Sequence, residues 1–333
     1  MKRIFILVLA LGVVISCRKE DQDAYDGPSL VDLAGPFSVI EPLASSQQEI
    51  DFAADGDIIF TAELSKNTDW IISITGSESG AVRTLTGSDR IIDASNAAWN
   101  GGANAFPAFA LEEVYVEMTF PNEVDAPVFQ ETITITGYKV DDGYLLTSFE
   151  DGLGSNWTIF NQTTVAGAIT CGNGQSAKGD CHYSWSGTVG WDWAIGSVMV
   201  KPDQGTFGLP SNANSLYFNL AFRALENVGP TNSFILFWFD EDENGDGVFD
   251  ENSEDRFIYE YWSQNSDWDL ISKRYSDLQF DAEGGQVETN GNGLPEPGKL
   301  ISVNIFFLAN PDNGNAKALV DHLIFTSGNP YTP

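Results

Sequence analysis

The chain of 333 residues carries 48 acidic side chains against 16 basic ones, a net charge of −32. It therefore offers no basic patch to neutralise phosphates, which excludes nucleic acid as a partner. Hydrophobic residues make up 42% and aromatic residues 12% of the chain, so the composition predicts a globular protein rather than a disordered one. The length predicts two domains.

The N-terminal segment has the pattern of an export signal. Lys2 and Arg3 precede an unbroken apolar run over 4–15, which is shorter than the ~20 residues that a membrane-spanning helix needs. The run leads into Cys17 and resembles the lipobox of bacterial lipoproteins, in which the cysteine is lipidated. We therefore predict a signal peptide over 1–17 and a lipid on Cys17; the alternative is an ordinary signal peptide with a chance cysteine.

Residues 18–26 begin with a charged stretch without apolar residues and are predicted to be an acidic tether. This stretch resembles the one that accompanies export to the outer face of the outer membrane in Bacteroidota, so the expected location is the cell surface. In such an oxidising compartment the two remaining cysteines, Cys171 and Cys181, are predicted to form a disulfide across a short loop.

Two β-rich units follow the tether. Over 27–138, short runs of β-branched and aromatic residues alternate with polar ones at 58–64, 70–74, 114–120 and 132–135, which predicts an Ig/PKD-like β-sandwich. Residues 139–144 are the expected linker. The unit over 145–333 contains further strand patterns at 216–222, 234–239, 256–262, 300–307 and 320–325, and predicts a jelly-roll (galactose-binding-like) β-sandwich. The fold class is therefore all-β.

The strongest local motif is an acidic loop that predicts structural Ca²⁺. Oxygen ligands alternate along it and Gly247 permits the sharp turn; the expected ligands are Asp242, Asn244, Asp246, the Val248 carbonyl and Asp250. A competing register runs from Asp240 to Glu251, but it places Gly247 where an apolar residue is expected. The remaining alternative is a solvated acidic turn without metal.

Nine tryptophans must be divided between core and binding surface. Six are predicted to be core residues because they lie in apolar patterns or plug the first unit: Trp70, Trp99, Trp157, Trp193, Trp238 and Trp268. Sugars stack on flat apolar rings beside polar groups, and a glycine-rich stretch with such rings lies next to the predicted disulfide. The expected carbohydrate-binding residues are therefore Tyr183, Trp185, Trp191, Asp192 and, at a polar loop, Trp262; alternatively, the two indoles at 185 and 191 only cover the end of the sandwich.

The segments 148–151, 179–183, 190–193 and 320–325, with the acidic loop at 240–251, together resemble the C-terminal module of surface glycan-binding lipoproteins. These proteins are encoded beside the SusC/SusD uptake pair in polysaccharide-utilisation loci of Bacteroidota. The resemblance implies a non-catalytic protein that captures a polysaccharide for a SusC/SusD-type transport complex. It also implies a second cation position between the first and last strands, at Glu150 and Asp321.

The acidic charge argues mildly against a sulfated or uronate polymer, so a neutral β-glucan such as laminarin is the expected ligand. Two other classes stay open: a calcium-stiffened adhesin or structural surface protein, and a β-sandwich glycosidase or lyase. The chain has only two histidines, His182 and His322, and no G-x-S-x-G nucleophile motif. The sequence therefore favours a binding protein over an enzyme.

Overall fold

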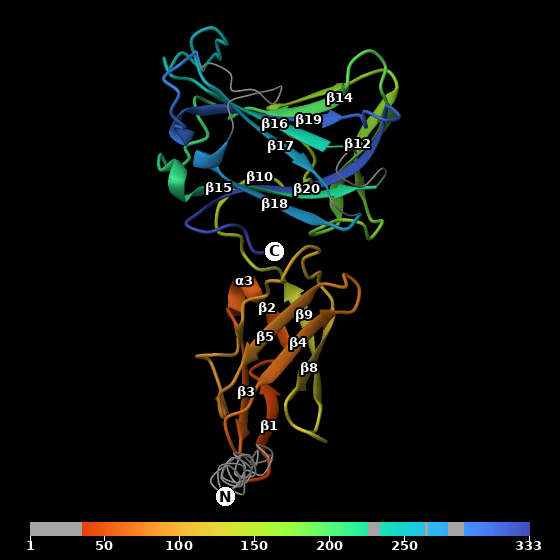
Figure 1. Cartoon of the computed structure of the whole chain (residues 1–333), viewed down its shortest axis with the longest axis vertical. Helices are drawn as coiled ribbons and strands as arrows, with labels where there is room; N and C mark the ends of the chain where they lie inside the picture. Colours follow the sequence, from red (N-terminus) through yellow and green to blue (C-terminus); the bar gives the residue numbers. More distant parts are fainter. Residues whose placement is uncertain (1–34, 226–233, 264–265, 279–289) are drawn as a thin grey trace, which may run out of the picture.

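The computed structural model describes residues 35–225, 234–263, 266–278 and 290–333. The predicted signal peptide, Cys17 and the acidic tether lie outside these described residues. Within the described ranges the chain is all-β, with one α-helix of four residues, α3 (Phe52–Asp55), and three short 3-10 turns. Two β-sandwiches are stacked along the long axis of the molecule (Figure 1). No helix in the part of the chain that is described is long and apolar enough to cross a membrane.

The N-terminal sandwich has an immunoglobulin-like arrangement. One sheet contains β1 (Val39–Ser45), β3 (Ile58–Leu64), β6 (Ile91–Ile92) and β7 (Ala98–Trp99). The other has the order β2 (Glu49–Asp51), β9 (Phe129–Gly137), β8 (Glu113–Thr119), β4 (Trp70–Gly76) and β5 (Val82–Gly87). The chain thus crosses from one sheet to the other between β1 and β2, where β2 pairs in parallel with β9.

Period-two alternation sets the faces of this sandwich. On β8, Val114, Val116 and Met118 are buried, whereas the residues between them point to solvent. Trp70 and Trp99 are buried in the core between the sheets, which confirms both as core residues. The indole N–H of Trp99 donates to the Gly102 carbonyl, so its polar atom is satisfied inside the core.

The C-terminal sandwich also consists of two antiparallel sheets. The sheet nearer the N-terminal sandwich, here called the proximal sheet, has the order β12 (Val165–Cys171), β13 (Cys181–Thr188), β20 (Asn315–Ser327), β15 (Leu216–Ala224) and β18 (Asp269–Arg274), with β10 (Tyr144–Thr147) also paired to β20. The sheet farther away, the distal sheet, has the order β11 (Trp157–Asn161), β14 (Ala194–Val200), β19 (Leu300–Leu308), β16 (Phe234–Glu241) and β17 (Arg256–Trp262).

The strand order identifies a jelly roll. Numbered from β13 to β20, the eight main strands pair as first, eighth, third and sixth in the proximal sheet, and as second, seventh, fourth and fifth in the distal sheet. This is the order that two interlocked Greek keys produce. The predicted fold class is therefore confirmed. The core between the sheets includes Phe237 and Phe239 of β16, both fully buried, which face Phe218 of β15.

The two sandwiches meet through apolar and charged contacts. Phe106 of the N-terminal sandwich stacks on Tyr331, near the end of the chain, at 6.0 Å between ring centroids. Asp141 forms an ion pair with Lys178 (2.6 Å) and accepts a hydrogen bond from the Tyr331 hydroxyl (2.8 Å). Burial would raise the pKa of Asp141, but hydrogen bonding from His322 and the charge of Lys178 outweigh it and hold this pKa well below its usual range. These contacts join the two sandwiches.

Candidate functional site

The outer side of the distal sheet, here called the distal face, is unusually apolar. On β16, Leu236 and Trp238 point away from the core because they alternate with the core residues Phe237 and Phe239. Leu236 packs beside Ile258 of β17 and Leu308 of β19, and each is only 4–8% exposed. These residues lie on the outer side of the distal sheet and therefore form a cluster separate from the sandwich core. No third layer of strands covers this face in the described part of the chain.

Aromatic and cationic groups lie at the centre of the distal face. Trp238 packs against Phe306 of β19, with ring centroids 4.4 Å apart. The Arg256 guanidinium lies 4.1 Å from the Trp238 ring centroid and 4.4 Å from that of Phe249. Arg256 also donates from Nε to Asp240, so its positive charge is matched by a carboxylate. The centre of the face therefore presents rings and one neutralised cation.

Two buried polar atoms beside these rings have no hydrogen-bond partner in the described structure: Trp238 Nε1 and Asn304 Oδ1. Trp238 and Asn304 lie directly opposite each other on β16 and β19, so their side chains are neighbours on the distal face. An unpaired buried donor or acceptor typically costs ~1–3 kcal/mol, which makes this pair a place where an added polar group is favourable.

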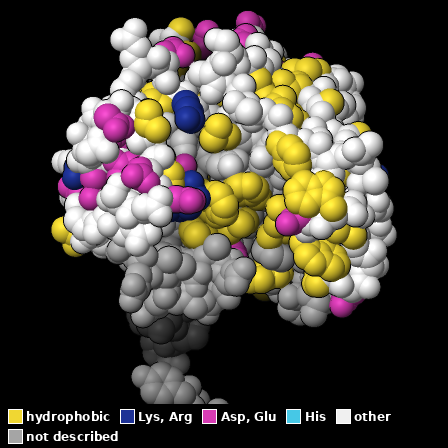
Figure 2. Space-filling model, turned by 90° about the horizontal axis from the view of Figure 1, so that it is seen from above, with side chains coloured by type: hydrophobic (Ala, Val, Ile, Leu, Met, Phe, Trp, Pro, Cys, Tyr) yellow, Lys and Arg dark blue, Asp and Glu magenta, His cyan; other side chains and the backbone are white. Residues whose placement is uncertain are grey.

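Exposed indoles mark both ends of the distal face. At the β11 end, Trp191 is 75% exposed and lies 6.4 Å from the ring of Phe160, and Trp193 is 49% exposed. At the β17 end, Trp262 is 39% exposed. The distal sheet has five strands, and its four spacings of ~4.8 Å make the face roughly 19 Å wide. Figure 2 looks down on this side of the molecule and shows hydrophobic side chains gathered around a hollow.

The structure contradicts the prediction that Trp185 and Tyr183 form a sugar platform. Both are 1% exposed and pack in the sandwich core, with their ring centroids 4.3 Å apart. The reason is that β13 runs from Cys181 to Thr188, so positions 181, 183 and 185 all point inward. The Trp185 indole N–H donates to Asn161 Oδ1 (3.0 Å), as a buried indole requires. Of the five predicted residues, Trp191, Asp192 and Trp262 lie on an exposed surface.

Asp192 has a local role in this structure. Its carboxylate accepts a hydrogen bond from the Ala194 amide (2.8 Å) at the start of β14. The side chain thus stabilises the turn that carries Trp191 and Trp193. Its predicted contact with a sugar stays a prediction.

Two of the six predicted core tryptophans are placed differently. Trp193 is half exposed because it lies in the turn before β14, whose inward positions begin at Ile195. Trp238 belongs to the distal face, because only one face of the apolar run 234–239 packs in the sandwich core. Trp157 packs partly buried against the core, and Trp268 is 8% exposed with its N–H donated to the Gln175 carbonyl.

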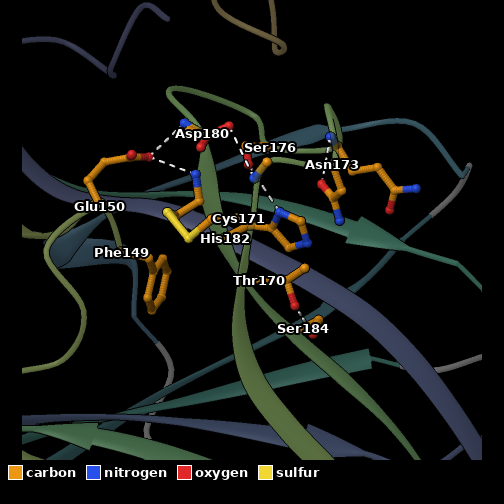
Figure 3. The surroundings of a disulfide bond; sticks show 12 residues. Phe149, Glu150, Thr170, Cys171, Asn173, Ser176, Asp180, His182 and Ser184 are labelled. Carbon is orange, nitrogen blue, oxygen red and sulfur yellow. Dashed lines mark hydrogen bonds between the residues drawn. A yellow bond between two sulfur atoms is a disulfide. The ribbon is translucent and has the colours of Figure 1, made fainter.

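The predicted disulfide is present. Cys171 ends β12 and Cys181 begins β13, where the two residues are paired across the strands and joined by an S–S bond of 2.06 Å. Figure 3 shows that Glu150 lies beside the loop that the disulfide closes and accepts hydrogen bonds from the amides of Asp180 and Cys181. Asp321 accepts from the amides of Ala177 and Lys178.

Glu150 and Asp321, the second predicted cation position, therefore converge on one loop, where both bind backbone amides. Asp321 is fully buried, and burial raises its pKa well above the usual range despite these hydrogen bonds. No group of three or more His, Cys, Asp or Glu side chains among the described residues forms a metal-binding cluster. The second cation position at Glu150 and Asp321 stays a prediction.

The acidic loop between β16 and β17 is folded by its own side chains. Asp242 accepts hydrogen bonds from the amides of Gly245 (2.6 Å) and Gly247 (2.7 Å), and Asn244 accepts from the Asp246 amide (2.8 Å). Burial would raise the pKa of Asp242, but these amides lower it overall. The competing register is disfavoured because Asp240 is bound to Arg256 and Ser302. Asp242 and Asn244 thus lie on one turn with their oxygens bound to its amides, whereas Asp250 accepts from the Asn252 amide and the Ser253 hydroxyl. The predicted calcium site stays a prediction.

No family model matches the chain, and no curated protein matches it. Among solved structures, it is similar to the family 11 carbohydrate-binding module of the cellulosomal cellulase Lic26A-Cel5E of Clostridium thermocellum, with 18% identity, 56% of this chain and 96% of that chain covered, and a TM-score of 0.38. SGBP-B from a complex xyloglucan utilization locus in Bacteroides uniformis shares 11% identity over 88% of this chain and 72% of that chain, with a TM-score of 0.35. Both likenesses are distant, with identities below 20% and TM-scores below 0.4.

Proposed function

We propose that the chain is a non-catalytic carbohydrate-binding protein that holds a polysaccharide along the distal face. The observation that supports this proposal is a sheet face lined by apolar and aromatic side chains, with no third layer of strands over it among the described residues and exposed indoles at both ends. Flat rings match the C–H faces of pyranose sugars, and a row of rings over roughly 19 Å suits an extended chain better than a single sugar.

The unpaired polar atoms suit a sugar hydroxyl. A hydroxyl can accept a hydrogen bond from Trp238 Nε1 and at the same time donate one to Asn304 Oδ1. Arg256 stacks on Trp238, so its side chain has to shift for a sugar to reach these atoms. Because Arg256 is already paired with Asp240 and the whole chain is strongly acidic, a neutral β-glucan such as laminarin is the proposed ligand.

The proposed setting is the cell surface, with the chain anchored through Cys17 and serving a SusC/SusD-type uptake complex. This part rests on the sequence alone, since Cys17 lies outside the described residues. We also propose a structural Ca²⁺ in the acidic loop, with Glu150 and Asp321 as a second cation position. The proposed loop ligands are Asp242, Asn244, Asp246, the Val248 carbonyl and Asp250. A calcium-stiffened adhesin and a glycosidase or lyase are the alternative functions.

Titration calorimetry of the whole chain with laminarin, mixed-linkage β-glucan and xyloglucan tests the proposal. Trp191→Ala and Trp262→Ala should each lower affinity by ~1–3 kcal/mol, a magnitude measured for bases stacked on aromatic residues. Tyr115 is a matched control, because it is 54% exposed on the N-terminal sandwich. Tyr115→Ala should leave affinity unchanged.

The outcomes separate the three functions. Glycan affinity that depends on Trp191 and Trp262 but not on Tyr115 supports a binding protein. If no polysaccharide binds, the adhesin is favoured. New reducing or unsaturated ends in the titrated glycan would show an enzyme.

A further inference from the structure

The turn 189–193 carries the most exposed indole of the distal face, so its rigidity matters for binding. A ring that must be ordered when a ligand arrives lowers affinity, whereas a ring already fixed does not. The ends of the turn are hydrogen-bonded to the segment between β19 and β20. Val189 N donates to the Gly314 carbonyl (2.7 Å), and the Trp193 carbonyl accepts from Ala309 N (2.8 Å).

The middle of the turn is held by one buried side chain, Gln162, which follows β11 and is 3% exposed. Gln162 Oε1 accepts hydrogen bonds from the amides of Gly190 (2.7 Å) and Trp191 (3.3 Å). Its Nε2 donates to the carbonyls of Asp192 (2.7 Å) and Ala194 (3.2 Å). The amide group therefore uses both donors and accepts twice, with every partner between Gly190 and Ala194.

The sequence of the turn is adapted to this contact. A Cβ atom on Gly190 would come within 2.7 Å of Gln162 Oε1, so a larger residue there would push the amide away. Gln162 is also fixed by its own backbone, since its N–H donates to the Ile195 carbonyl (2.9 Å) on β14. The Gln162 side chain thus has a defined position relative to β11, which it follows, and β14, to which its backbone is bonded.

We infer that Gln162 is a positioning residue that fixes the Trp191 turn in its binding orientation without touching the ligand. This inference rests on the proposed function, because it assigns Trp191 to a glycan-binding face. A side-chain amide suits this role because it offers two donors and two acceptor positions in one plane, which neither a carboxylate nor a hydroxyl can do. Affinity should therefore depend on Gln162 only through Trp191.

Gln162→Glu is the sharpest test, because it keeps the shape and both acceptors but removes both donors. We expect laminarin affinity to fall roughly tenfold through the cost of ordering the turn. Hydrogen exchange of the Gly190 and Trp191 amides should become faster in the absence of ligand. Gln175→Glu is the control, since Gln175 is exposed on the loop between β12 and β13 and receives the same charge change.

A double-mutant cycle separates positioning from a general structural effect. In the Trp191→Ala background, Gln162→Glu should have no further effect on laminarin affinity, because coupled residues are not additive. An undiminished tenfold loss in that background would overturn the inference. If Gln162→Glu does not fold, Gly190→Ala takes its place, because it displaces the same amide from the exposed side of the turn.

Failure of the inference and failure of the proposed function give different results. If the wild-type chain binds no glycan, the proposed function fails, and the exchange rates of Gly190 and Trp191 still report whether Gln162 holds the turn. If the wild-type chain binds laminarin and Gln162→Glu changes neither affinity nor exchange, the inference alone is wrong.

Discussion

The two sandwiches present sheet faces of opposite character. On β8 of the N-terminal sandwich, the outward positions are Glu113, Tyr115 and Glu117, which alternate with a buried apolar set. On β16 of the C-terminal sandwich, the outward positions include Leu236 and Trp238, which alternate with core phenylalanines. Both strands lie inside a sheet that has a second sheet on one side only. β8 follows the usual hydrophobic-in, polar-out pattern, whereas β16 is apolar on both sides.

This difference shows what a strand that is apolar on both faces means in a two-layer sandwich. One face is needed for the core, so the other must be covered by another layer or reserved for a ligand. Exposed apolar surface is unfavourable unless it has a partner. The distal face is not covered by a third layer of strands among the described residues, whereas the polar N-terminal face requires no partner.

The largest expected effect contrasts the inner and outer sides of the C-terminal sandwich. Trp185→Ala should lower the free energy of unfolding by ~3–5 kcal/mol, because it removes a fully buried indole from the core. Trp191→Ala should change it by only ~0.5 kcal/mol, because its ring is 75% exposed. Urea denaturation measures both. Equal losses in the two variants would mean that Trp191 is also part of the core.

The next effect concerns the junction between the sandwiches. Asp141→Asn should destabilise the protein by ~3 kcal/mol at pH 7, because it leaves Lys178 largely buried without its counter-ion. The pKa of Asp141 is lowered in the folded state, so its contribution is present above the unfolded value of 3.8 and is lost as the pH falls through the lower folded value. Urea titrations between pH 7 and pH 2 should show a larger loss in the wild type than in Asp141→Asn, in which only the other carboxyls titrate.

Asp142 provides the control for the junction, since it is the adjacent acid and is exposed. Asp142→Asn should change the free energy of unfolding by at most ~0.5 kcal/mol. A similar loss in both variants would show that net charge, rather than the Lys178 contact, is responsible.

The smallest of the three effects separates the two sandwiches by their response to calcium. At a calcium concentration 100 times Kd, a bound ion adds about 2.7 kcal/mol to the stability of the sandwich that holds it. Chelation should therefore lower the melting temperature of the C-terminal sandwich and leave the N-terminal one nearly unchanged. Calorimetry with and without EDTA measures this difference.

Asp246→Ala should reproduce the effect of chelation even when calcium is in excess. Asp203→Ala removes an exposed acid from the same sandwich outside the loop and should not. If EDTA shifts neither transition, the loop of Asp242 and Asp246 is an acidic turn without metal.

Local patterns in the sequence predicted much of the fold. The β-branched run at 58–64 coincides with β3, and the run at 256–262 coincides with β17. The pairing of Cys171 with Cys181 also follows from local spacing. These features depend on residues close together in the chain, which is why they are visible without a structure.

The binding face could not be located in the same way. Tyr183 and Trp185 alternate with serines, a period-two signal that could have placed both rings inside the sandwich. The position of Trp238 beside Asn304 depends on a pairing between strands far apart in the sequence. Which of two apolar strand faces is left uncovered is decided by the order of strands in the sheets, and no local pattern contains that order.

The stacking of the two sandwiches fixes the direction in which the distal face looks. β1 begins at one pole of the molecule and the distal sheet forms the other, with the joined junction between them (Figure 1). For a chain held to a surface near its start, the N-terminal sandwich would act as a folded spacer between that surface and the distal face. If a polysaccharide binds across that face as proposed, both ends of the polymer would lie clear of the surface, and it could be captured anywhere along its length without threading an end.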